Sequence, residues 1–277
     1  MSWRSSLEVY DLATGTCRVI LRTERLIEAP NWHPEGWFLV NGEGRLWRAT
    51  AAGLKVIETP EGLACNNDHG FLPDGRIVFS AHRGRGAEIH VLGAGQMVPA
   101  MPSWWHGAQG TRITYACARG DRIVRIAVMD LQTGVEQVLT PGTAHHDGPD
   151  FAPDGTIWFN SDASGRAQIW RIGADGPEQV FADPNVNWFP HPSPDGRHVL
   201  YLAYPPGTEG HPRDLDVGLC LMDCATGARR RVVDLFGGQG SINVPCWAPD
   251  GQAFAFMRYA PAFMRSAPAA ADPKTAV

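Results

Sequence analysis

The 277-residue sequence contains no run of Lys or Arg longer than Arg229–Arg231, and its formal net charge is −5 with a pI near 6.0. Nucleic-acid binding requires a concentrated basic face, so this composition argues against a nucleic-acid partner. No stretch approaches the length of about 18 apolar residues that a membrane span needs. The first residues, MSWRSSLEVYDL, also lack the apolar segment of a secretion signal. We therefore expect a soluble, cytoplasmic protein with no membrane partner.

Cysteine is sparse and scattered. With no secretion signal, reduced thiols are expected rather than a disulfide framework. Cys220 and Cys224 do not have zinc-knuckle spacing, and no second pair lies nearby. The six cysteines are Cys17, Cys65, Cys117, Cys220, Cys224 and Cys246.

Several catalytic motifs are also missing from the sequence. It has no Gly-x-Ser-x-Gly elbow for a serine hydrolase, no phosphate-binding loop and no dinucleotide fingerprint between a strand and a helix. We therefore expect no nucleotide cofactor.

An internal repeat organises the chain. Six segments align on one glycine, at spacings of 39, 35, 45, 41 and 55 residues, and four of them end in Pro-Asp-Gly. In such a turn Pro presets φ, Asp bonds its own backbone and Gly takes a positive φ. The segments are EAPNWHPEG (28–36), NDHGFLPDG (67–75), PSWWHGAQG (102–110), DGPDFAPDG (147–155), WFPHPSPDG (188–196) and NVPCWAPDG (243–251).

The spacing suits four short antiparallel strands per repeat, and six repeats predict an all-β, six-bladed propeller. Residues 7–21 match the second hairpin of a blade, whereas the last repeat has only its first two strands. The N-terminal hairpin is therefore expected to close the last blade. We expect residues 1–259 to form this single domain and the Ala/Pro-rich residues 260–277 to form a flexible tail.

These repeats resemble those of the TolB-like family of six-bladed propellers, over essentially residues 7–259. The resemblance implies the propeller fold and carries little information on function, because one fold hosts many activities.

The propeller geometry explains why TAHHDGPDFAPDG (143–155) places titratable residues before a plain strand and turn. Innermost strands begin around the mouth of the central channel, so residues that enter them should converge into one site. Loops on the same face contribute Arg83 and the long insert PPGTEGHPRDLD (205–216), which is typical of a lid or binding loop. The candidate ligand-binding residues are Glu28, Asn67, Asp68, Trp104, Trp105, Asp147, Asn187, Trp188, His211, Gln239 and Asn243.

Metal binding is the most specific hypothesis for the mouth. Imidazoles and carboxylates suit manganese, zinc, iron or nickel, and three converging side chains are enough for an open site. The first candidates are His69, His146 and His191. The alternative is that these histidines bond backbone carbonyls or water around a wet channel. Two interpretations are also open for three tryptophans near the mouth, which would either stack on a sugar or pack between blades. They are Trp104, Trp105 and Trp188.

PHPSPDG (190–196) resembles the metal-binding strand of oligogalacturonate lyases. These propeller enzymes use histidines and a divalent cation to cleave uronic-acid glycosides by elimination. The resemblance implies a ligand role for His191, while Phe189 stands where that family has a second histidine.

The mouth residues suggest two reactions. In an elimination, His106 or His145 would act as the base and Arg83 or Arg213 would hold the acid group of a uronic-acid substrate. In a hydrolysis, a metal would activate water.

Two functional classes therefore stay open. One is a metal-dependent, carbohydrate-active lyase or hydrolase. The other is a non-catalytic propeller that binds a protein partner or a small ligand. Clustered histidines favour the first class, because protein-docking faces are richer in aromatic and Arg anchors.

Overall fold

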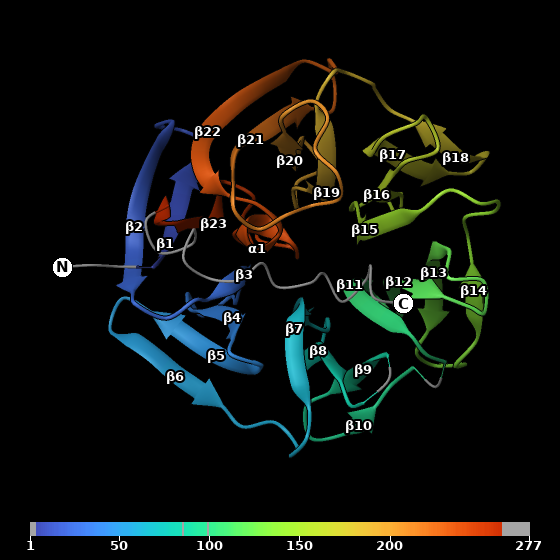
Figure 1. Ribbon diagram of the computed structural model, residues 1–277, viewed down its shortest axis with the longest axis horizontal. Coiled ribbons are helices and arrows are strands. Elements are labelled where there is room, and N and C mark those ends of the chain that lie inside the picture. The colour runs from blue at the N-terminus through green and yellow to red at the C-terminus, as the bar shows by residue number, and fades with distance from the viewer. Residues whose placement is uncertain (1–3, 85, 99, 262–277) are drawn as a thin grey trace.

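Six β-sheets surround a central axis in the computed structural model of this protein (Figure 1). The structure describes residues 4–84, 86–98 and 100–261. The six-bladed propeller predicted from the repeats is confirmed. We number the blades along the chain, and in each blade the strands run antiparallel from the axis outwards.

Five blades have four strands each. Blade 1 holds β3 (Glu28–Trp32), β4 (Phe38–Gly42), β5 (Arg45–Thr50) and β6 (Gly53–Ile57). Blade 2 holds β7 (Ala64–Phe71), β8 (Ile77–His82), β9 (Ala87–Val91) and β10 (Gly95–Gln96). Blade 3 holds β11 (Ser103–Gln109), β12 (Arg112–Ala118), β13 (Val124–Asp130) and β14 (Glu136–Val138). Blade 4 holds β15 (His146–Phe151), β16 (Ile157–Ser161), β17 (Gln168–Gly173) and β18 (Gly176–Gln179). Blade 5 holds β19 (Val186–Pro192), β20 (His198–Tyr204), β21 (Leu215–Asp223) and β22 (Arg229–Gly237).

Blade 6 joins the two ends of the described chain. It contains β23 (Ala253–Tyr259), β1 (Ser5–Asp11) and β2 (Thr16–Thr23), and β1 pairs with β23 along its whole length. The segment between β23 and the ring axis pairs with β23 only through one isolated bridge, from Trp247 to Phe254, and is not a full strand. A short helix, α1 (Gln239–Ile242), precedes it. The predicted closure of the last blade by the N-terminal hairpin is thus confirmed.

The closing pair is fixed by a partly buried ion pair as well as by backbone bonds. Arg258 Nε on β23 lies 3.1 Å from Glu8 Oε1 on β1, and Glu8 is 5% exposed. The same guanidinium donates to the backbone oxygen of Asp234 on β22. Arg258 therefore links the closed blade to its neighbour.

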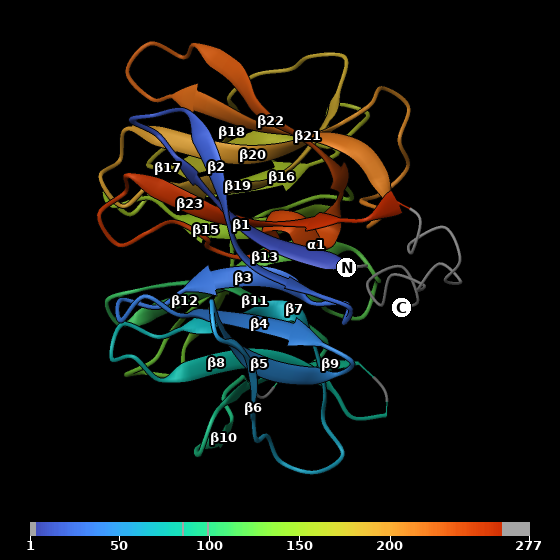
Figure 2. The ribbon, with the colours of Figure 1, turned by 90° about the vertical axis from the view of Figure 1, so that its left-hand side faces the viewer.

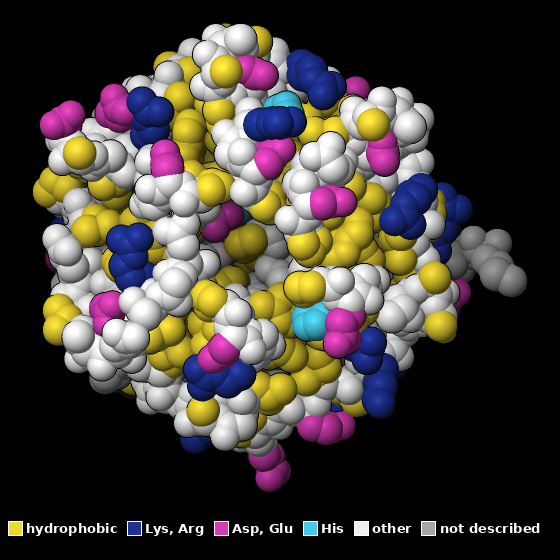
Figure 3. Space-filling model, turned by 180° about the vertical axis from the view of Figure 1, so that it is seen from behind, with side chains coloured by type: hydrophobic (Ala, Val, Ile, Leu, Met, Phe, Trp, Pro, Cys, Tyr) yellow, Lys and Arg dark blue, Asp and Glu magenta, His cyan; other side chains and the backbone are white. Residues whose placement is uncertain are grey.

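The two faces of the ring carry different connections. Each innermost strand runs toward the face that carries the Pro-Asp-Gly turns, as β3 and its return strand β4 show in Figure 2. We call this the turn face, and the opposite face the mouth. Figure 3 views the turn face, where Asp and Glu side chains are spread over all the blades around a central hollow.

Apolar side chains from neighbouring blades pack against each other between the sheets. Trp32 and Trp247 pack in these clusters. Trp104 and Trp105 are also buried there, at 0% and 1% exposure.

Every innermost strand from β3 to β19 contains a register shift. The shifts lie between Glu28 and Asn31, Cys65 and His69, Trp105 and Gly107, Asp147 and Asp150, and Trp188 and His191. A bulge kinks its strand and changes the direction of the side chains next to it. Four buried polar residues of the channel lie at these bulges, namely Asp68, His106, Asp147 and Asp150.

The predicted flexible tail begins at Ala260, and its residues 262–277 lie outside the described part of the chain. Among the described residues, no helix has the length and apolar character needed to cross a membrane.

Candidate functional site

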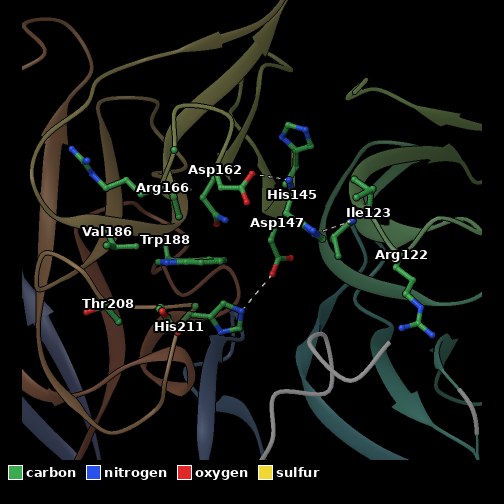
Figure 4. Close-up of a pocket in the computed structure, with 17 residues that line it drawn as sticks. Arg122, Ile123, His145, Asp147, Asp162, Arg166, Val186, Trp188, Thr208 and His211 are labelled. Carbon is green, nitrogen blue, oxygen red and sulfur yellow. Dashed lines mark hydrogen bonds and ion pairs between the residues drawn. The ribbon is translucent and has the colours of Figure 1, made fainter. Parts of the chain in front are cut away.

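A cavity of about 660 Å³ opens at the mouth over blades 3, 4 and 5 (Figure 4). Its wall comes from the β12–β13, β16–β17 and β20–β21 loops and from the starts of β15 and β19. These are the connections that the repeat analysis assigned to one face. The long insert after β20 contributes Thr208, Glu209, Gly210 and His211.

Asp147 lies at the centre of this site, at the start of β15 and 6% exposed. Its Oδ1 accepts the backbone N–H of Gly148 at 2.8 Å and lies 3.2 Å from His106 Nε2. The same Nε2 atom is 3.7 Å from Asp68 Oδ1. His106 is fully buried, and this one nitrogen faces two carboxylates, which come from blades 2 and 4.

His211 meets Asp147 from the opposite side of the cavity. Its Nε2 is 3.9 Å from Asp147 Oδ2, and Figure 4 shows the two side chains pointing toward each other. The His211 ring stands edge-on to Trp188, with ring centroids 4.4 Å apart. Asp68, His106, Asp147 and His211 thus form a continuous series of acids and imidazoles from the channel wall to the cavity.

His145 and His146 both line the cavity but differ in environment. The backbone N–H of His145 donates to Asp162 at 2.8 Å, and its ring Nδ1 accepts the N–H of Val124 at 3.3 Å. His146 is 5% exposed and packs near Phe159, and burial lowers its pKa to about 4. His146 is therefore a neutral imidazole at neutral pH.

His191 lies deeper in the channel, with both ring nitrogens engaged. Nε2 lies 2.6 Å from the Ile242 carbonyl, which can only accept, so Nε2 carries the hydrogen. Nδ1 lies 3.0 Å from Asp150 Oδ2. Burial raises the pKa of Asp150, and the bond to His191 opposes that rise.

A second polar network, which shares Asp68 with the first, occupies the channel beside blades 1 and 2. His69 Nε2 lies 3.2 Å from Asn41 Oδ1, and the Asn41 amide donates to Asn67 at 2.7 Å. Asn243, which follows α1, donates to Asp68 Oδ1 at 2.6 Å. Burial lowers the pKa of His69 to about 3. These residues join blades 1, 2 and 6 around the axis.

The remaining predicted residues lie elsewhere. Trp104 and Trp105 pack between blades, and Asn187 is buried with its amide donating to Gln168 and Asp183. Arg83 is exposed on the β8–β9 loop. Gln239 begins α1.

Glu28 and Arg213 interact with each other rather than with the cavity. Burial raises the pKa of Glu28, and the positive charge of Arg213 lowers it. Neither residue is part of the cavity wall. The structure thus separates Arg213 from His145, although the sequence placed both at one mouth.

Sequence reasoning missed Asn160, Asp162, Arg166 and Arg122 in the cavity wall. One feature of the sequence could have pointed to Arg122, which directly follows a Gly-Asp pair in CARGDR (117–122), a combination typical of a turn or loop. Its φ of 62° is in the left-handed region, which non-glycine residues rarely adopt and which recurs at functional sites.

The predicted metal set does not fit a shared ion in this arrangement. A histidine ligand needs a ring lone pair directed at the metal, and both nitrogens of His191 face protein groups. Within the described residues, no three His, Cys, Asp or Glu side chains are arranged to hold a metal ion. The divalent metal stays a prediction.

Comparisons with known proteins agree with this architecture. A solved structure from Agrobacterium tumefaciens, provisionally assigned as TolB, is 42% identical with a TM-score of 0.89, covering 94% of this chain and all of that one. An uncharacterized protein of Agrobacterium fabrum is 42% identical over 94% of both chains. The chain belongs to the TolB-like propeller family.

More distant likenesses show the fold alone. An oligogalacturonate lyase in complex with manganese has a TM-score of 0.56 at 16% identity, covering 90% of this TolB-like chain and 78% of the lyase. No family model matches the sequence.

Proposed function

We propose that this TolB-like propeller binds a small carbohydrate in the cavity at its mouth. The observation that carries the proposal is the wall itself, in which the indole of Trp188 packs against His211 and lines the same cavity as Asp147 and Asn160. A sugar ring offers an apolar C–H face to an aromatic ring and hydroxyl groups to polar side chains. The volume of about 660 Å³ is in the range of small-molecule sites.

A catalytic role, as a lyase or hydrolase acting on such a carbohydrate, is the second candidate. It is favoured by the carboxylate of Asp147, which lies between two imidazoles and can set their orientation and charge. His106 is fully buried, so it would act through Asp147 rather than touch a substrate. His145 and His211, which line the cavity, are the candidates for proton transfer.

Calorimetric titration with a panel of neutral sugars and uronic acids tests the binding proposal. Trp188→Ala should weaken binding of any sugar by about tenfold or more, because a stacked aromatic is lost from the wall. Trp47→Ala removes a partly buried indole on blade 1, away from the cavity, and is the matched control. Failure of every sugar to bind, or equal affinity in Trp188→Ala, would argue instead for the protein-binding alternative.

The same panel separates the catalytic candidate. Elimination produces an unsaturated, ultraviolet-absorbing product, whereas hydrolysis produces only new reducing ends. Each assay is run with and without added manganese, zinc, iron or nickel, so that a metal requirement appears as a gain of activity. Binding without either product would leave a non-catalytic role.

A cytoplasmic location is part of the proposal. It is supported by six cysteines, none of which forms a disulfide with another described residue. Fractionation of cells that express the native protein provides the measurement, and recovery in the periplasm would contradict it.

A further inference from the structure

The turns of blades 2 and 5 share the sequence Pro-Asp-Gly-Arg but hold their arginines differently. In blade 2, Arg76 Nε donates to Asp74 Oδ2 at 2.8 Å, and a second guanidinium nitrogen lies 2.7 Å from the same oxygen. In blade 5, Arg197 Nε lies 3.7 Å from Asp195 Oδ2, which is too long for a hydrogen bond. Asp195 instead accepts the hydroxyl of Ser193 at 2.6 Å. The Arg197 side chain is therefore not held by its own turn, and it is 76% exposed.

A second arginine lacks an acidic partner because of the alternation of strand β22. This strand begins with three consecutive arginines, and successive side chains of a strand point to opposite faces of its sheet. The first and third, Arg229 and Arg231, pair with aspartates at 2.7 and 2.5 Å. The middle one, Arg230, points toward blade 6, where it lies 3.5 Å from the Tyr10 hydroxyl. No ion pair joins Arg230 to another residue of the described chain.

Both arginines line one groove between blades 5 and 6 at the turn face. The groove has a volume of about 220 Å³, and its wall also contains Asp195, His198 and, from blade 6, Gln252. Figure 3 shows a histidine and a basic side chain next to each other over blade 5, near the top of the view. Side chains that are far apart in sequence thus meet in a concave part of this face.

His198 adds a third polar group to the groove. Blades 2 and 4 have isoleucine at the corresponding position, Ile77 and Ile157, so the turn itself does not require an imidazole there. His198 Nδ1 is enclosed by the protein without a hydrogen-bond partner among the described residues. The hydrogen of the neutral ring therefore belongs on Nε2, because on Nδ1 it would be buried without an acceptor.

The chemistry of the groove selects an anion. Two guanidinium groups and an imidazole N–H are all donors, and the guanidinium groups are positively charged. The one carboxylate of the wall, Asp195, is already engaged by Ser193 and by the backbone N–H of Arg197 at 3.0 Å. The three donors come from the β19–β20 turn, the start of β20 and the start of β22. A carboxylate offers its oxygens in one plane, whereas a phosphate offers oxygens in several directions and suits donors from several elements.

We propose that this groove binds a phosphate group, with Arg197 and Arg230 as its charged ligands and His198 as a third donor. The group belongs either to inorganic phosphate or to a phosphate monoester, which share this chemistry. The groove lies on the face opposite the mouth and shares no lining residue with the cavity there. The site is therefore independent of the proposed carbohydrate function, and both can be occupied at once.

Calorimetric titration of the full chain with inorganic phosphate, at constant ionic strength, tests the site. Arg197→Gln and Arg230→Gln should each weaken binding by about tenfold or more, because each removes a charged donor. Both side chains are exposed, so thermal unfolding of the variants should stay close to wild type. Arg76→Gln is the matched control, since Arg76 has the same place in the blade 2 turn but pairs with Asp74. It should bind phosphate as wild type does.

Parallel titrations with methyl phosphate and acetate distinguish the sources of the anion. Binding of both phosphates supports the site and shows that a monoester can enter it. Binding of inorganic phosphate alone also supports the site and identifies the free ion as its ligand. Acetate that binds as tightly as phosphate would overturn the assignment to a phosphate group. The site itself is overturned if wild type binds no phosphate, or if wild type, Arg197→Gln and Arg230→Gln bind it equally.

Discussion

The turn face and the central channel are built from the same residue types in different ways. At the turn face, Asp74, Asp154 and Asp250 each accept the backbone N–H of the residue two positions on, at 2.9 to 3.1 Å. In the channel, Asp68 and Asp150 bond to side chains 175 and 41 residues away in sequence. An aspartate of the turn face shapes its own turn, whereas one in the channel holds two blades together.

This comparison can be tested with two variants that each remove one carboxylate, one in the channel and one at the turn face. Asp150→Ala removes the partner of a buried histidine, and loss of one partner of a buried pair costs about 3 to 5 kcal/mol of unfolding free energy. Urea denaturation of the variant measures this cost. A cost below about 1 kcal/mol would show that the channel pair contributes little to holding the blades.

A second test uses pH. The pKa of His69 is lowered to about 3, so the folded protein leaves it neutral while the unfolded chain protonates it below about 6.5. Its contribution to stability therefore falls as the pH drops through that window, by about 2 kcal/mol at pH 5. Between pH 7 and pH 5, the unfolding free energy of wild type should therefore fall by about 2 kcal/mol more than that of His69→Gln. Urea denaturation at each pH measures both.

The raised pKa values of Glu28 and Asp150 act in the opposite direction, since these groups take up protons in the folded state. They are present in both proteins, so the difference between wild type and His69→Gln isolates the histidine. Identical pH profiles for the two proteins would contradict burial of a neutral His69.

The smallest effect is expected at the turn face. Asp154→Ala removes one exposed bond, from Thr156 N–H at 2.9 Å, and should cost about 1 kcal/mol. The same urea measurement applies. If Asp154→Ala cost as much as Asp150→Ala, the distinction between a local and a blade-linking aspartate would fail.

The sequence was informative where the structure is local. The Pro-Asp-Gly turns and their spacing predicted the six blades, and the hairpin at residues 7–21 predicted the closure of the ring. These signals are readable because each turn depends on residues within a few positions. The same logic placed Asp147, Trp188 and His211 at the mouth, where they now line one cavity.

The pairing of the site residues was not readable from sequence. Which histidine meets which acid depends on the direction that each bulge gives to its side chains, and bulges in these strands have no simple sequence signature. Trp104 and Trp105 lie near the start of their repeat segment as Trp188 does, yet both pack between blades. The cavity is off the ring axis because loops of unequal length from blades 3 to 5 build its wall.

The pairing of β1 with β23 has a consequence for how the chain folds. Ser5 and Tyr259 are partners, so the last sheet forms only after nearly the whole described chain has been brought together. Contacts between residues so far apart in sequence slow folding, because their loop entropy is lost before the contact is gained. Until then β23 presents an unpaired edge, to which another chain can add. A circular permutant that links residue 261 to residue 4 and opens the 224–228 turn would make this pairing local and pass the end-to-end closure to β21 and β22, which pair across that turn.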